Sequence, residues 1–314
     1  MKNKKGFEFG FAWIFAILAG AAILFLAVFA TINLISTSRY EVDTKVAAQL
    51  GILLNPVETN LESGKYTVIE FPSETRVFNR CRETGNFGQQ RISTSVKSGI
   101  GKEFQEQGVE SVFYNKYIFS SGVEQGKKLH VFVKPLKMPY KIADLIFISS
   151  GNYCFINPPD IIEDEVLGLG LKNVKISSGV RECPKDSKVV CFSSRGCDVN
   201  VDLQSRSVEK SGQTVYYEEN SDGESSLIYG AIFADPEIYE CQVKRLMKRT
   251  GELAHLYALK SEFLTGKGCT SGLAQELRNY ANIVQIESSF NIRYVAGLSE
   301  ELRRRNNALS CELF

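Results

Sequence analysis

The chain has 314 residues, of which 44% are hydrophobic and 23% charged, a composition typical of an ordinary globular protein that excludes a disordered stalk. Its formal net charge is +1, and residues 1–38 carry +2 from three lysines and one glutamate, so the rest of the chain carries −1. A body this close to neutrality argues against nucleic acid as the main partner.

The first predicted element is a transmembrane helix over residues 9–35. No charged residue occurs between Glu8 and Arg39, and a helix of that length crosses a hydrocarbon core of about 30 Å. Lysines dominate the basic tail, residues 1–8, whereas the charges just after the apolar run cancel. The positive-inside rule therefore predicts a single-pass protein of the cell membrane with a cytoplasmic N-terminus and an extracytoplasmic bulk.

Two processed forms are alternatives to this fixed anchor. Val28-Phe29-Ala30 has the small-x-small form of a signal-peptidase site, but the apolar core before it is too long for a secretory signal. Lys4-Lys5-Gly6-Phe7 resembles the end of type IV pilin-like leaders, which would make Gly6 and Phe7 a processing site. That resemblance is partial, because the fifth mature position, where such pilins carry Glu, holds Phe11.

A juxtamembrane helix is predicted over residues 36–55. Apolar side chains there recur three and four residues apart, until Asn55-Pro56 ends the pattern. This helix either continues the membrane span, as in a pilin, or packs on the folded domain as the end of a plain anchor.

Residues 56–235 are predicted to form a mixed α/β exterior domain. Alternating or β-branched runs separated by turn residues predict strands, and YCFIN, a helix from Pro158-Pro159-Asp160 to Gly168 or Gly170, and NVKISS predict a βαβ unit. The other predicted strands are KYTVIEF, TRVFNRC, RISTSVKS, SVFYNKYIF, KLHVFVK, ADLIFIS, KVVCFSS, CDVNVDL, TVYYE and LIYGAIFA.

Residues 236–314 are predicted to be a helical hairpin or a three-helix element, which makes the fold class α+β. One helical stripe runs from Tyr239 to Leu264, and a second runs from Leu273 to Val284. The polar stretch 287–291 interrupts the pattern, which favours a third helix that folds back.

All eight cysteines follow the apolar run, and an even number in an exoplasmic region predicts disulfides. The closest pairs have seven and five residues between them and no histidine nearby, which is unlike a zinc site. A third helix that folds back would bring Cys311 to the turn that holds Cys269, and a short local loop favours Cys183 with Cys191. The remaining candidates are Cys81, Cys154, Cys197 and Cys241.

Several stretches resemble a family of uncharacterised single-pass membrane proteins from small-genome archaea, over most of the chain. The stretches are IEFPSETRVFNRC, FYNKYIF, ADLIF and YGAIFADPEIYECQVKRLMKR. The resemblance implies an anchor with an exterior domain and supplies no catalytic residue.

Motifs of known chemistry are sparse. The chain has two histidines, His130 in a predicted strand and His255 in a predicted helix, too few for a three-histidine metal centre. Asp198 to Asp202 partly matches a calcium loop, but Leu203 stands where the loop needs Gly, so a strand is the better interpretation. No cofactor is expected.

For the carboxylate and basic clusters, a structural role is a better interpretation than a catalytic one. Acidic side chains in the first turns of the helix predicted to start at Pro158-Pro159-Asp160 suit the helix dipole, although they could also supply a carboxylate pair. The basic clusters on the C-terminal helices are interpreted as solvated faces or partner contacts. These residues are Asp160, Glu163, Asp164 and Glu165, and Lys244, Arg245, Lys248, Arg249, Arg303, Arg304 and Arg305.

The leading functional hypothesis is a membrane-anchored extracytoplasmic binding or scaffold protein. Its expected partners are the lipid bilayer, through residues 9–35, and another protein or a second copy, through the C-terminal helices. One alternative is a pilin-like filament subunit. Another is an envelope hydrolase that uses a Ser-Lys pair or paired carboxylates.

Overall fold

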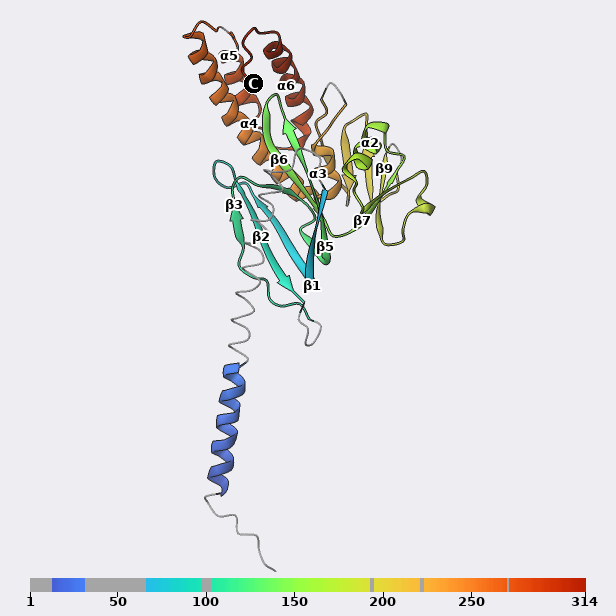
Figure 1. The fold of residues 1–314 in the computed structure, drawn as a ribbon, viewed down its shortest axis with the longest axis vertical. Coiled ribbons are helices and arrows are strands. Elements are labelled where there is room, and N and C mark those ends of the chain that lie inside the picture. The colour runs from blue at the N-terminus through green and yellow to red at the C-terminus, as the bar shows by residue number, and fades with distance from the viewer. Residues whose placement is uncertain (1–12, 32–65, 98–102, 193–194, 221–222, 270) are drawn as a thin grey trace, which may run out of the picture.

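The structure, a computed structural model, describes residues 13–31, 66–97, 103–192, 195–220, 223–269 and 271–314. Its first element is the helix Trp13–Thr31, 19 residues with a mean hydropathy of 2.6 and none of its apolar window buried (Figure 1). At 1.5 Å per residue it is about 28 Å long, so it is a candidate membrane anchor or signal. The predicted tail, the juxtamembrane helix and the processing residues Gly6 and Phe7 lie outside the described residues.

A mainly antiparallel sheet of six strands begins the folded body, in the order β3-β2-β1-β5-β6-β4 (Figure 1). Alternation along β5 sends Val131 to a small cluster on one face and Phe132 to the main core on the other. The described part of KYTVIEF, from Tyr66 on, and TRVFNRC form one strand, because the ladder with β5 only shifts register around Pro72, which has no N–H to donate. The strands are β1 Tyr66–Arg82, β2 Gln89–Val96, β3 Ser111–Phe113, β4 Tyr117–Phe119, β5 Val123–Lys137 and β6 Lys141–Ser149.

A second sheet of six strands has the order β12-β11-β10-β9-β7-β8 and is parallel from β8 to β10. The predicted βαβ unit is β7, the helix α2 (Asp160–Leu169) and β8, and α2 ends at Gly170, which adopts a left-handed conformation with φ 65°. The strands are β7 Asn152–Ile156, β8 Val174–Ser177, β9 Ser187–Phe192, β10 Val199–Asp202, β11 Ser207–Lys210 and β12 Gln213–Tyr216.

Disulfides cover the face of the second sheet that turns away from the main core. Cys154 and Cys191 point to that face, and they bond to Cys183 and Cys197 respectively. The predicted Cys183–Cys191 pair is therefore wrong. Cys183 precedes β9 whereas Cys191 is its next-to-last residue, so an extended strand at about 3.3 Å per residue separates them, and the loop after β9 returns Cys197 instead.

The helix α3 (Leu227–Phe233) corrects a second prediction, because LIYGAIFA was expected to be a strand. All seven residues of α3 are buried, so the segment shows no amphipathic period that would distinguish a buried helix from a buried strand. Side chains from other parts of the chain form hydrogen bonds with the backbone groups at both ends of α3. The Glu218 carboxylate accepts the N–H of Leu227, and the Lys210 ammonium donates to the carbonyl of Ala234.

Three helices complete the chain and confirm the predicted break and fold-back (Figure 1). Cys269 and Cys311 are bonded, as the fold-back implied, and Cys81 of β1 is bonded to Cys241 of the first helix. Helix and sheet side chains share one hydrophobic cluster, so these helices pack on the sheets and close an α+β body. The helices are α4 Pro236–Thr265, α5 Ala274–Ile283 and α6 Ile292–Asn307, with the short 3-10 turn η2 Ser289–Asn291 before α6.

Candidate functional site

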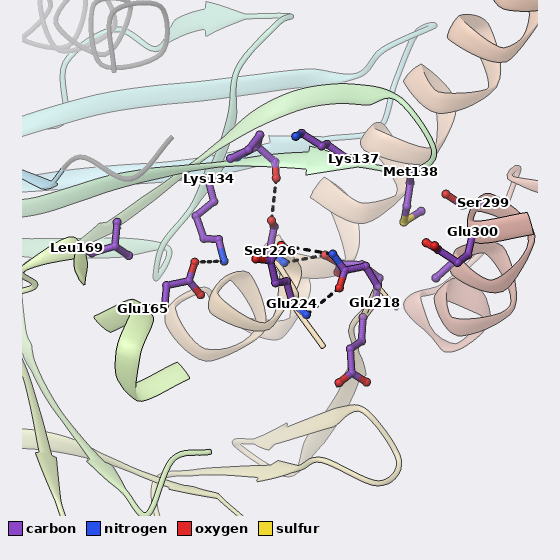
Figure 2. A pocket seen from close by; sticks show the side chains of 14 residues that line it. Lys134, Lys137, Met138, Glu165, Leu169, Glu218, Glu224, Ser226, Ser299 and Glu300 are labelled. Carbon is purple, nitrogen blue, oxygen red and sulfur yellow. Dashed lines mark hydrogen bonds and ion pairs between the residues drawn. The ribbon is translucent and has the colours of Figure 1, made fainter. Parts of the chain in front are cut away.

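A charged cavity of about 300 Å³ lies where the end of β5, α2, the segment before α3 and α6 meet. Figure 2 shows that these four parts of the chain each contribute side chains to it. Five glutamates and two lysines line the cavity, so its wall is acidic overall. The lining residues are Lys134, Pro135, Lys137, Met138, Glu165, Leu169, Glu218, Glu219, Asn220, Glu224, Ser226, Ala296, Ser299 and Glu300.

Lys134 is the buried cation of the cavity, with 8% of its surface exposed. Its ammonium forms an ion pair with Glu165 of α2 and donates to the carbonyl of Ser225 at 3.1 Å. The ammonium also lies 4.8 Å from the ring centroid of Tyr229, whose hydroxyl donates to Glu165 at 2.7 Å. The pairing offsets the desolvation cost of both charges and links β5, α2 and α3.

Glu218 is the buried acid, and 5% of it is exposed. Its carboxylate accepts the N–H of Ser226 at 2.8 Å and of Leu227 at 3.1 Å, at the N-terminus of α3. Burial raises the pKa of Glu218 to about 7, against the opposing effect of these N–H donors and of Lys134. Glu218 therefore changes its protonation state near neutral pH.

This titration predicts a pH-dependent stability that Glu218→Gln removes. Between the ordinary pKa of 4.5 and the native value of about 7, the unfolded chain has lost the proton that the native chain keeps. The stabilisation is thus present below pH 4.5 and is lost as the pH rises through 7. From pH 5 to pH 8, denaturant unfolding should show wild type losing on the order of 2–3 kcal/mol relative to Glu218→Gln. The exposed Glu224→Gln is the control, and a wild-type-to-Glu218→Gln difference that stays constant with pH would contradict the expectation.

Ser226 and Lys134 of the cavity do not form a nucleophile-base pair. The Ser226 hydroxyl donates to the carbonyl of Pro135 at 2.8 Å, while the Lys134 ammonium is occupied by Glu165 and Ser225. An activated serine needs its hydroxyl hydrogen-bonded to a neutral base. The arrangement is instead that of a preformed wall whose buried polar groups are satisfied within the protein.

The rim of the cavity carries the charges that a solute would meet first. Glu219 and Glu300 pair with arginines outside the lining, Arg206 and Arg303. Glu224 and Lys137 stand at the rim and are exposed. These two arginines therefore offset two of the negative charges of the lining.

Most of the acidic residues singled out from the sequence lie elsewhere. Of the four acids at the start of α2, Glu165 alone lines the cavity, while Asp160 and Glu163 occupy the first turn of the helix. Asp202 ends β10 and accepts the N–H groups of Gln204 and Ser205, so the strand interpretation of this stretch is confirmed.

The two histidines are also apart from the cavity. His130 contacts Tyr66 across β1 and β5, and burial lowers the pKa of its imidazole. His255 is exposed on α4. Within the described ranges no group of three or more His, Cys, Asp or Glu residues is placed to hold a metal ion.

Lys134, Glu218, Ser226 and Tyr229 were not singled out by the sequence. Lys134 sits in an alternating strand and Tyr229 in a uniformly apolar run, where neither pattern marks a site. Comparison with protein-family models, with curated proteins and with solved structures finds no match, so no residue role is transferred from a relative.

Proposed function

We propose that the chain is a membrane-anchored, extracytoplasmic binding protein that receives a small, positively charged solute in the Lys134–Glu218 cavity. The observation that carries the proposal is this preformed acidic cavity, whose buried charges are fixed by hydrogen bonds and ion pairs within the protein. Sites of this kind bind without large rearrangement, because their polar groups are already oriented.

The apolar helix and the disulfides support the proposed extracytoplasmic compartment. The apolar helix Trp13–Thr31 precedes a body in which all eight cysteines are paired, as oxidising compartments favour. The lysines of residues 1–8 support a cytoplasmic N-terminus. These features support a cavity on the outer side of the membrane, with the lipid bilayer as the first partner.

Thermal unfolding of the full chain in detergent tests the ligand class. Putrescine, a small dication, should raise the unfolding midpoint, because at ten times its Kd it adds about 1.4 kcal/mol to the free energy of unfolding. Succinate should leave the midpoint unchanged. Glu224→Lys should abolish the response by placing a cation at the rim. Glu106→Lys makes the same charge change at an exposed residue outside the lining and should respond like wild type. A midpoint unmoved by putrescine, or moved equally in Glu224→Lys, would reject the proposal.

The alternatives rest on less. An envelope hydrolase would use the raised pKa of Glu218 in a carboxylate pair with Glu165, but Glu165 is occupied by Lys134 and Tyr229. A Ser-Lys hydrolase built on Ser226 and Lys134 would first have to break the hydrogen bonds that these two side chains already make. The pilin-like alternative depends on processing between Gly6 and Phe7, which lie outside the described residues.

A further inference from the structure

The helix α4 carries large apolar side chains on the face that points away from the core. Leu256, Leu259 and Phe263 are 60%, 59% and 66% exposed. Their spacing of three and four residues places them in one stripe along the last turns of the helix. We call these three residues the outer stripe.

The opposite face of the same turns is built from small residues. Ala254, Ala258 and Ser261 are buried, and a Cβ added at Gly251 would lie 3.1 Å from the carbonyl oxygen of Ala281 in α5. Close approach of α5 therefore requires small side chains, and the large ones do not build the core of the single chain. Contiguous exposed apolar side chains of this kind mark an interaction surface.

Opposite charges stand at the two ends of the outer stripe. Glu252 is one turn before Leu256, on the same side of the helix and exposed. Lys267 follows the end of α4, and its ammonium lies 5.8 Å from the ring centroid of Phe263. The stripe thus runs from an acid to a base.

This order of charges favours a second copy of the chain as the partner of the outer stripe, with the two α4 helices antiparallel. A second copy laid antiparallel on the stripe puts Leu256 against Phe263 and each Glu252 beside the other copy's Lys267. A parallel copy would put like charges side by side. An antiparallel pair is related by a two-fold axis, so the same surface serves both copies and the assembly closes at two. From this complementarity we infer that the protein self-associates as an antiparallel pair through the outer stripe of α4.

The first experiment maps the contact on the full chain in detergent. A photo-crosslinking p-benzoylphenylalanine at position 259 should give a covalent dimer. The same residue at position 167, where Leu167 of α2 is 64% exposed, should not. Dimer at both positions, or at neither, would overturn the inference.

Charge reversal then tests the direction by sedimentation velocity in a density-matched detergent. Glu252→Lys sets two like-charge contacts in a symmetric pair and should weaken association on the order of tenfold. The double variant Glu252→Lys/Lys267→Glu should restore it, and Leu259→Asp should abolish it while the unfolding midpoint is kept. A double variant no tighter than the single one would overturn the antiparallel pairing. Association unaffected by Leu259→Asp would place the contact elsewhere, for example in the membrane helix.

Discussion

Replacing Arg245 by alanine should lower the free energy of unfolding by about 3–5 kcal/mol. Arg245 is 0% exposed, and its guanidinium donates to the carbonyls of Phe87, Tyr114 and Lys116 and to the side-chain oxygen of Gln242, at 2.7–3.1 Å. Alanine would leave these acceptors without a donor and open a cavity under α4. Denaturant unfolding of the full chain, followed by circular dichroism, measures the loss.

Two variants separate the planar fork of Arg245 from its charge. Arg245→Lys keeps a cation but cannot reach the same set of carbonyls, so it should lose a large part of the same stability. Arg304→Ala removes an exposed arginine paired with Glu301 and should change stability by less than about 0.5 kcal/mol. If Arg245→Ala behaved like Arg304→Ala, Arg245 would not be holding α4 on the first sheet.

The role assigned to Arg245 depends on a buried polar network that sequence alone does not reveal. In the sequence it belongs to a basic cluster on a helix, for which a solvated face is the usual interpretation. In the structure it lies inside, with its guanidinium 4.7 Å from the ring centroid of Tyr117. Burial lowers its pKa to about 10, so it stays charged at neutral pH. Neighbouring Gln242 continues the network to Gln90, which extends to Asn79.

Elements with a clear period could be predicted, and those without one could not. The alternation in β5 and the stripe of α4 each report which face is buried, so their type follows from local sequence. The α3 segment is apolar on all sides, and its helical state depends on Glu218 and Lys210, which lie outside the segment. Tertiary contacts, not the local sequence, therefore determine that this segment is a helix.

The same limit applies to the cavity and to the cysteines. Lys134, Glu165 and Glu218 come from three elements far apart in the chain, so no spacing could bring them together before the sheets were assembled. Helix geometry did bring Cys269 to Cys311, because two fold-backs fix where each helix ends. The pairing of Cys183 with Cys191, predicted from their short separation alone, was wrong because the extended strand β9 lies between them.

The disulfide between Cys81 and Cys241 should stabilise the body most among the four, because it closes the longest loop. Its sequence separation is 160, against 6 for Cys191–Cys197. Loop-closure entropy assigns about 5 kcal/mol to a loop of the first length and about 2 kcal/mol to the second. The bond also fixes the end of β1 to α4, in the same region as the Arg245 hydrogen bonds.

Cys81→Ser/Cys241→Ser should therefore lose about 3 kcal/mol more unfolding free energy than Cys191→Ser/Cys197→Ser. Both variants remove one bond and two thiols, so the pair controls for composition and for the oxidation of the remaining six cysteines, which thiol titration under denaturing conditions verifies. Denaturant unfolding without reductant gives the two values. Equal losses, or a larger loss in the Cys191/Cys197 variant, would contradict the loop-length argument. The unfolded chain would then keep residual contacts between β1 and α4 that already restrict the long loop, so that the covalent bond adds little.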